Sequence, residues 1–428
     1  MTSQRPLPPP RQGGNSTALR RLNERRLLTA LRRLGQASKS DLSGQLNITQ
    51  NAVGQIVQVL ERQGLVSGVG RRMGQRGQPA RLLQLNPDGA YAIGIKVGCR
   101  STESLLVDFT GRVLQSRRSD SLFPDPAAAL DLARRGALEA MRTLPAERRD
   151  RLEGIGLVLS PDLFAGSADA PGDARRAQLW LAADLPGQLR AALGCRLLVE
   201  QAGVAVAVSE LFLGHGREID DFACLYVNST ICGGIVLQGD YKRGVCDDRI
   251  IGLMPVAPSR IAPPPRGARH RRDSGPVQLR DRASGSSLFR HLAAHGVVAE
   301  RAADLDSILD SHPRLVGDWL DDAADALLAP VLAIGGLLGP RAVILDGNLP
   351  VRLIDALLLR LDAGLAAAWP GRGDEPASGS APGRAMGLRR GLAGTQAAAL
   401  GAALLPLHYH HQESSRAEPA ASHDMAGA

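Results

Sequence analysis

Near the start of the chain, apolar residues recur at helical spacing in two separate stretches. The first stretch carries Leu22, Leu27, Leu28, Leu31 and Leu34, and it ends at Gly35. The second stretch ends at Gly64, and its apolar positions are Val53, Ile56, Val57 and Leu60. Each stretch therefore predicts an amphipathic helix that buries one face.

Polar residues between these stretches supply signals for helix starts. Ser38 followed by Asp41 has the spacing of a capping box and predicts a second, short helix. Asn47 and Ile48 form a turn, after which Thr49 can cap the helix that carries Val53. Two helices joined by a short turn, with one apolar stripe on the second, are typical of a helix-turn-helix.

Two short strands are expected after this helix, at residues 65–66 and 81–85. The segment between them, SGVGRRMGQRGQPA, places Arg71, Arg72 and Arg76 among glycines. A hairpin with such a loop is the ending of a winged helix, and its arginines can lie along the DNA backbone or enter the minor groove.

From Tyr91 onward, the apolar pattern changes to strands followed by alternating strands and helices. Strands are expected at residues 91–97, 104–108, 113–117, 155–159, 197–199, 223–227, 234–237 and 342–345, and helices at 127–144, 185–193, 323–338, 353–367 and 391–405. This order predicts an α/β body with two similar halves around a cleft.

Charge separates the head of the chain from its body. Residues 1–85 hold 14 Lys and Arg but only 3 Asp and Glu, whereas the whole chain has a net charge of +8. A basic head on a near-neutral body is the electrostatic pattern of a polyanion-binding protein, although a solvated basic tail has the same composition.

The outward face of the third helix carries the side chains that suit DNA recognition. Gln50, Asn51 and Gln55 have amides that donate and accept hydrogen bonds, so they can contact base edges in the major groove. Thr49 stands at the start of this helix, and Lys39 at the start of the preceding one. Arg71, Arg72 and Arg76 would contact phosphate or enter the minor groove. Together, the residues of the two helices and the loop predict a DNA-binding surface. The alternative is a small helical bundle with a basic loop.

Composition narrows the classes of protein to which the chain can belong. No apolar run reaches the length of a membrane span, and the five cysteines are scattered without a Cys-x-x-Cys pair, so we expect a cytoplasmic protein without a disulfide framework or thiolate zinc site. Residues 1–18, 258–287 and 407–428 are predicted to be disordered or flexible from their Pro, Gly, Arg and Ser content. His270, His408, His410 and His411 are expected to be solvated.

Several segments resemble the ROK family, which joins bacterial sugar kinases and transcription repressors. The head resembles the repressor branch over NERRLLTALRRLGQASKSDLSGQLNITQNAVGQIVQVLERQGLV and RGQPARLLQLNPDGAYAIGI, and the body resembles the family at GIGLVLSP, LLVEQAGVAVAVSELFLG, GGIVLQGDYKRG and GTQAAALGAALL. The resemblance implies a winged helix-turn-helix over residues 19–86. It also implies a two-lobed actin/hexokinase-like (ribonuclease-H-like) ROK domain over residues 90–406, used for effector binding and dimerisation.

The sequence departs from the kinases of this family at four motifs. The Asp-x-Gly-Gly-Thr phosphate hairpin is replaced by residues 96–100, KVGCR, and the Asp that acts as general base is replaced by Ala202. The Glu and His of the Gly-Glu-Ile-Gly-His-Met motif are absent, as are the zinc-binding cysteines. We therefore expect no catalytic residue, no cofactor and no metal.

The resemblance implies a repressor of carbohydrate uptake or catabolism genes that binds a palindromic operator as a homodimer or higher homo-oligomer. Its effector is expected to be a sugar or sugar phosphate in the cleft, near Ser160, Glu200, Gln201 and Asn228. Two alternatives stay open from the sequence: a ROK-type sugar kinase, and a dimeric DNA-binding protein that senses nothing.

Overall fold

The computed structural model describes residues 16–72, 80–164, 173–242, 248–259, 261, 277–299, 304–369 and 386–409. It divides into two compact units, one made by the described residues up to Gly89 with the end of the last helix from His408, and the other by Ala90–Leu407. Arg76 and residues 1–15 of the tail predicted over residues 1–18 lie outside the described residues, as do His270, His410 and His411. Residues 16–18 of that predicted tail begin the first helix instead. No helix among those ranges is long and apolar enough to cross a membrane.

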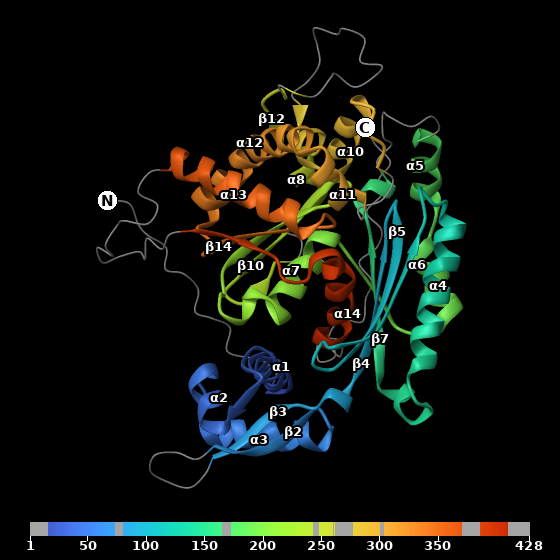
Figure 1. Cartoon of the computed structure of the whole chain (residues 1–428). Helices are drawn as coiled ribbons and strands as arrows, with labels where there is room; N and C mark the ends of the chain where they lie inside the picture. The colour runs from blue at the N-terminus through green and yellow to red at the C-terminus, as the bar shows by residue number, and fades with distance from the viewer. Residues whose placement is uncertain are drawn as a thin grey trace, which may run out of the picture. The chain divides into compact units, whose positions relative to one another are not determined.

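The first unit is a winged helix-turn-helix of three helices and a three-stranded sheet (Figure 1). Its sheet is antiparallel, in the order β1-β3-β2. The elements are α1 (Ser16–Leu34), β1 (Gln36–Ser38), α2 (Lys39–Leu46), α3 (Gln50–Arg62), β2 (Val66–Arg72) and β3 (Ala80–Leu85). The predicted stripe of α3 is buried at Val53, Val57 and Leu60, and that of α1 at Leu27, Leu28 and Leu31. Leu22 and Leu34, which were predicted to belong to the α1 stripe, are exposed.

Both predicted helix caps of this unit are confirmed. The Ser38 hydroxyl accepts the Asp41 N–H at 3.2 Å and the Asp41 carboxylate accepts the Ser38 N–H at 2.9 Å, which completes a capping box. Thr49 Oγ1 accepts the Ala52 N–H at 3.2 Å at the start of α3. Asn47 ends α2 with φ +54°, a left-handed conformation that asparagine tolerates better than most residues. The angle between α2 and α3 is thus set by local hydrogen bonds.

The first lobe of the second unit is a five-stranded sheet in the order β6-β5-β4-β7-β8. Helices α4 and α6 cover one face, where the alanines of α4 pack against isoleucines of the central strands (Figure 1). The elements are β4 (Tyr91–Val97), β5 (Ser101–Asp108), β6 (Val113–Asp120), α4 (Pro126–Thr143), β7 (Leu152–Leu159), α5 (Asp173–Ala182), α6 (Leu185–Leu193) and β8 (Leu197–Glu200).

The second lobe repeats this plan with a sheet in the order β11-β10-β9-β14-β15. Helices α12 and α13 cover its outer face around a core that includes Trp319. The elements are α7 (Ala202–Leu213), β9 (Phe222–Val227), β10 (Ile231–Leu237), β11 (Asp240–Tyr241), α8 (Asp248–Leu253), β12 (Pro255–Val256), β13 (Val277–Gln278), α9 (Leu279–Ala283), α10 (Gly285–Ala294), α11 (Asp304–Ser311), α12 (Pro313–Leu338), β14 (Ala342–Gly347), α13 (Val351–Ala368), β15 (Gly387–Arg390) and α14 (Ala397–Tyr409).

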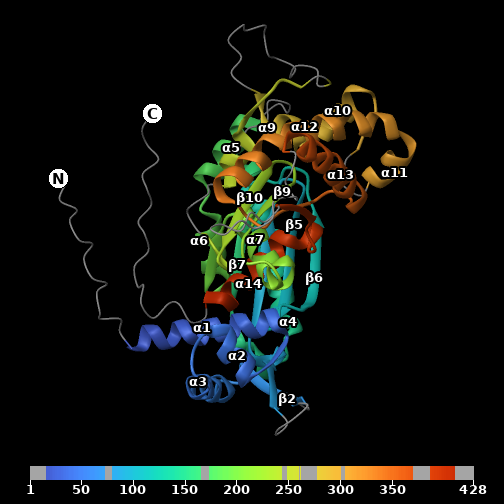
Figure 2. The ribbon, with the colours of Figure 1, turned by 90° about the vertical axis from the view of Figure 1, so that its left-hand side faces the viewer.

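Helices α7 and α14 lie between the two sheets of this unit (Figures 1 and 2). Glycines bring their backbones into direct contact with the neighbouring elements. A Cβ at Gly156 of β7 would stand 1.9 Å from the Ala402 carbonyl oxygen of α14, and one at Gly203 of α7 would stand 1.9 Å from that of Gly233. The glycines of both sheets are therefore required for close packing, which a side chain would prevent.

Part of the predicted disordered loop over residues 258–287 is ordered. Residues 277–287 form β13, α9 and the first turn of α10, and Leu279 and Ala283 belong to the core of the second lobe. Arg282 is buried in a 2.7 Å ion pair with Asp322. The charged composition suggested a loop, but the Asp322 carboxylate neutralises the arginine and lets the segment fold. Residues 262–276 lie outside the described residues.

The prediction that His408 is a solvated tail residue is wrong. Helix α14 continues to Tyr409, because Leu407 is buried beyond residue 405, the end expected from the sequence. His408 is also buried, and burial together with the charges of Arg25 and Arg32 lowers the pKa of its imidazole well below the usual value. This imidazole is therefore neutral at physiological pH.

Asp346 gives the second unit a measurable pH dependence. Its carboxylate lies at the end of β14 and accepts the N–H groups of Gly347 and Gly394, at 2.8 and 2.9 Å. Burial raises its pKa from 3.8 to about 6, assisted by the nearby Glu210 carboxylate and opposed by these hydrogen bonds and by Arg390. Because the folded-state pKa is the higher one, the contribution of this carboxyl group to stability is fully present below about pH 3.8 and is lost as pH rises through 6.

We expect Asp346→Asn to change the pH profile of stability. Between pH 5 and pH 7.5, the free energy of unfolding of the variant should rise by about 1 kcal/mol relative to wild type, because the amide cannot ionise. The amide also loses one backbone hydrogen bond, but this loss does not depend on pH. Urea denaturation at the two pH values measures the difference. Asp131→Asn, an exposed carboxylate on α4, is the control, and an identical profile in all three proteins would contradict the assignment.

Candidate nucleic-acid interface and ligand cavity

Helix α3 presents the predicted base-reading residues on the surface of the first unit. Gln50, Asn51 and Gln55 are exposed, while the opposite stripe of the helix is buried. Because the Thr49 side chain is used as the helix cap, it is fixed beside the first turn rather than pointing away from it. The arrangement leaves a row of amides along one accessible helix face.

Lys39 from α2 joins this row. A Cβ at Gly54 of α3 would stand 3.7 Å from Lys39 Nζ, so the ammonium group lies directly beside α3. The one acid at the end of the helix, Glu61, forms a 2.8 Å ion pair with Arg81 of β3. Its charge is thus compensated by a neighbour, which reduces its repulsion of a phosphate backbone.

The hairpin of β2 and β3 carries the predicted wing arginines. Arg71 is exposed opposite Arg81, and Arg72 lies opposite Ala80 in the ladder. A bulge between Gly68 and Gly70 bends the hairpin at its base. The exposed cations described for this unit therefore come from two places. Lys39 belongs to the α2–α3 helix pair, and Arg71 belongs to the hairpin of β2 and β3.

Arg71→Ala is expected to weaken binding to DNA of any sequence. A cation on phosphate contributes through counterion release, so its loss should reduce the slope of log K against log[salt] by about 1 without altering base preference. Fluorescence anisotropy across a salt series measures this slope. Arg134→Ala, an exposed arginine on α4, is the matched control, and an unchanged slope for Arg71→Ala would exclude the wing from the interface.

The second unit contains a cavity of about 220 Å³ between its two lobes. The first lobe contributes Arg100, Arg118, Asp120, Ser121 and Leu122, and the second contributes Asn228, Ser229, Gly285, Phe289, Asn348 and Leu349. Asn228 and Asn348 follow neighbouring parallel strands, β9 and β14, at their carboxyl ends. Ligands of α/β proteins bind at this edge of a sheet.

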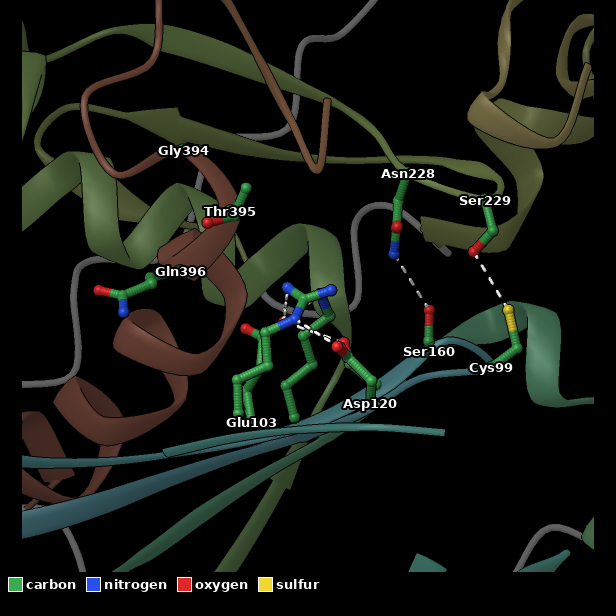
Figure 3. Close-up of polar contacts among 12 residues, drawn as sticks. Cys99, Glu103, Asp120, Ser160, Asn228, Ser229, Gly394, Thr395 and Gln396 are labelled. Carbon is green, nitrogen blue, oxygen red and sulfur yellow. Dashed lines mark hydrogen bonds and ion pairs between the residues drawn. The ribbon is translucent and has the colours of Figure 1, made fainter. Parts of the chain in front are cut away.

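Of the four predicted ligand residues, the structure brings two together. Asn228 Nδ2 donates to Ser160 Oγ at 3.5 Å across the lobes (Figure 3), and Asn228 lines the cavity. Glu200 ends β8 and accepts the backbone N–H of Gln201 at 3.1 Å, while Gln201 stands at the start of α7. Neither Glu200 nor Gln201 lines the cavity. A ligand role for all four predicted residues stays a prediction.

A second contact between the lobes was not found from the sequence. The Cys99 thiol donates to Asp162 Oδ2 at 2.7 Å, and the Ser229 hydroxyl of the second lobe donates to the same oxygen. Cys99 also lies 3.5 Å from Ser229 (Figure 3). Burial and the negative charge of Asp162 raise the pKa of the Cys99 thiol well above its usual value, so it remains a protonated donor. The residues come from segments 63 to 130 positions apart, a pairing that local patterns do not reveal.

The hairpin that replaces the phosphate-binding motif is filled by charged side chains. Lys96 is buried, and its Nζ lies 3.6 Å from Glu103 Oε1. Arg118 Nη1 donates to the same oxygen at 3.0 Å and Arg118 Nε donates to Asp120 at 2.9 Å. Figure 3 shows this group facing the segment Gly394–Gln396. These four side chains are therefore paired with one another on β4, β5 and β6.

Position 202, where the resemblance places the catalytic acid of the kinases, holds a buried methyl group. Ala202 begins α7 and is 3% exposed. The two nearest acids along the chain are engaged in backbone hydrogen bonds. Glu200 accepts from Gln201, and Glu210 accepts from the N–H groups of His215 and Leu392 at 3.1 and 2.7 Å. Glu210 therefore holds the chain before α14 in place.

Comparisons with known proteins agree with this fold. An uncharacterized protein of Sinorhizobium fredii is 24% identical over 350 residues, 79% of this chain and 82% of that protein. The xylose repressor of Bacillus subtilis is 21% identical over 233 residues, which cover 54% of this chain and 59% of the repressor. No protein-family model matches the chain.

Two solved structures cover 92% and 74% of the chain. A ROK family transcriptional regulator, a homologue of the Escherichia coli MLC protein, is 19% identical with a TM-score of 0.64, over 92% of this chain and 97% of that one. A ROK family glucokinase from Streptomyces griseus, solved with glucose and AMPPNP, is 19% identical with a TM-score of 0.54, over 74% and 99%. The chain therefore has the fold of these ROK proteins, which is the fold that the resemblance of its sequence motifs implied.

Proposed function

We propose that this chain, which has the fold of ROK-family regulators and kinases, is a DNA-binding transcriptional repressor whose kinase-like unit performs no phosphoryl transfer. The observation that carries the proposal is the exposed amide row of α3, anchored by the Thr49 cap and flanked by Lys39 and Arg71. Amides at base edges and cations at phosphates are the two kinds of contact that specific DNA binding needs.

The similarity to a solved regulator over 92% of the chain supports this function, as does the similarity to the xylose repressor. We infer that two copies bind a palindromic operator, because helix-turn-helix heads in a two-fold dimer contact two related half-sites. The regulated genes are inferred to serve carbohydrate uptake or catabolism. An effector in the second unit would act by favouring one DNA-affinity state of the protein.

The second candidate is a sugar kinase, which the fold shared with the glucokinase favours. Two features of the chain count against it. A general base must reach the substrate hydroxyl, and Ala202 offers a methyl group where the acid is expected. A nucleotide phosphate needs an open anion cradle, and Lys96, Glu103 and Arg118 fill the hairpin with paired charges.

Two assays on the purified chain separate these functions. ATP consumption, measured with a panel of hexoses, pentoses and N-acetylated amino sugars, should stay at the background rate. Anisotropy with mixed-sequence duplex DNA at low ionic strength should show binding that salt weakens. Sugar-dependent ATP turnover would establish the kinase, and absence of DNA binding at low salt would refute the repressor.

A further inference from the structure

Gly54 lies in the interior of α3, where the packing of the protein does not require a glycine. The helix runs from Gln50 to Arg62, and glycine inside a helix is destabilising relative to alanine. Among the described residues outside the helix backbone, a Cβ at Gly54 would meet one heavy atom within 4 Å, Lys39 Nζ at 3.7 Å. This is an ordinary contact distance, so folding gives no reason for the missing side chain.

The other described glycines of the first unit differ from Gly54. Three of them adopt a left-handed backbone conformation that favours glycine: Gly35, Gly64 and Gly70. At Gly68 a Cβ would stand 2.5 Å from Arg81 Nε, and at Gly89 it would stand 2.8 Å from a backbone oxygen. Gly44 of α2 lies in open space with no atom, and hence no cation, within 4 Å. Among these glycines, Gly54 therefore combines open space with a neighbouring cation.

The gap at Gly54 opens on the polar face of α3. Asn51 precedes it by three positions and Gln58 follows it by four, and both side chains are exposed. Residues at these spacings are neighbours on a helix surface. Gly54 itself is partly exposed. The backbone of α3 is therefore accessible between two amide side chains that can contact DNA.

Lys39 places a positive charge at this gap. It is the first residue of α2, it is exposed, and its ammonium group has no ion pair or hydrogen bond with another described residue. Arg81 of the same unit is, by contrast, paired with Glu61 at 2.8 Å. The nearby Asp41 carboxylate accepts the Ser38 N–H at 2.9 Å in the capping box. An ammonium group with three donors thus stands beside accessible helix backbone.

We propose that a phosphate group of the DNA backbone lies against α3 at Gly54, where the absent side chain leaves room for it and Lys39 donates to its oxygens. The ammonium group favours an anion, and phosphate is the anionic group of duplex DNA. Phosphate contacts position a protein on the duplex, so this contact sets the depth at which Asn51 and Gln55 enter the major groove. The inference rests on the proposed function, because it requires DNA binding through α3.

Variants that fill the gap test this contact in the full chain. Gly54→Ala and Gly54→Leu are measured by fluorescence anisotropy with mixed-sequence duplex DNA at low ionic strength. We expect the Kd to rise about threefold for alanine and about tenfold for leucine, because a larger apolar side chain holds the phosphate farther from Lys39. The melting temperature without DNA should equal or exceed that of wild type, because both residues have a better helix propensity than glycine. A purely structural role of Gly54 would lower the melting temperature.

A double-mutant cycle tests whether Gly54 and Lys39 act on the same phosphate. Lys39→Gln alone should raise the Kd about tenfold and reduce the slope of log K against log[salt] by about 1. In a chain that already carries Gly54→Leu, the same substitution should raise the Kd only about twofold, because the phosphate no longer reaches the ammonium group. Gly336→Ala is the control, since a Cβ at this glycine of α12 would meet nothing within 4 Å. Its Kd should equal that of wild type.

Three results would overturn the proposal. They are a wild-type Kd in the folded Gly54 variants, a melting temperature below wild type in both of them, or an equal effect of Lys39→Gln with and without Gly54→Leu. Binding of the wild-type chain to the same DNA is measured first. If wild type binds and the Gly54 variants bind equally well, the phosphate contact fails alone, whereas absence of wild-type binding refutes the repressor itself.

Discussion

A chain carrying both Gln50→Ala and Asn51→Ala is expected to lose its preference for its operator while still binding DNA nonspecifically. Each bidentate amide–base contact contributes about 1–3 kcal/mol of discrimination, so the pair should cost about 2–6 kcal/mol on the operator, or at least about 30-fold in affinity. Affinity for unrelated duplex should hardly change, because phosphate contacts from Lys39 and Arg71 remain.

The structure makes this double variant a clean test. Both side chains are exposed in the first turn of α3, whereas Val53 and Val57 pack on the opposite face and the Thr49 cap is retained. The helix should therefore form normally. Gln63→Ala, an exposed glutamine at the other end of the same helix, is the control and should bind the operator like wild type. Equal operator affinity of the double variant and wild type would remove α3 from base recognition.

The second large effect is expected for the free energy of unfolding of a glycine variant. In Gly156→Ala, the new methyl group would meet the Ala402 carbonyl oxygen at 1.9 Å, a distance that no relaxed structure allows. Either α14 or β7 must move, so the variant should lose about 3 kcal/mol or more of unfolding free energy. Because α14 packs between the two sheets, we expect the damage to spread to both lobes of the second unit.

Gly336→Ala is the matched control for this prediction. Gly336 lies exposed on α12, and a Cβ there would meet nothing within 4 Å. Alanine has the better helix propensity, so this variant should gain about 0.5–1 kcal/mol. Urea denaturation followed by circular dichroism measures both variants. If both variants had the same free energy of unfolding, the assignment of a close contact between β7 and α14 would be wrong.

Local signals explain what could be predicted from the sequence. The capping box of Ser38 and Asp41 and the cap at Thr49 involve residues three positions apart, so their types and spacing are sufficient to locate helix starts. The order of strands and helices and the two-lobed fold followed from periodicity and from motif resemblance. Strand β1 was missed because three residues, Gln36–Ser38, are too few to show a period.

Errors arose where tertiary contacts override local composition. Residues 277–287 contain enough charge and serine to suggest a loop, yet the Arg282–Asp322 ion pair and buried Leu279 fold them. His408 follows a proline and was assigned to the tail, whereas α14 continues through it. Helical packing beyond Pro406 depends on surrounding residues distant in sequence, and these are not visible in a local window.

The candidate cavity was only partly predictable for the same reason. Asn228 was found because it directly follows the strand expected at residues 223–227. Arg100, Ser121 and Asn348 stand in three separate segments, and their shared position depends on the packing of the two lobes. Their residue types alone, an arginine, a serine and an asparagine in turns, are common on protein surfaces.

The most direct test of the account is selection of bound DNA from a pool of random duplexes by the purified wild-type chain at moderate salt, followed by sequencing. A repressor with the helix-turn-helix described above should enrich one sequence made of two inverted half-sites about one or more helical turns apart. If successive rounds enriched no sequence over the starting pool, the chain would not be a specific DNA-binding protein and its central assignment would be contradicted.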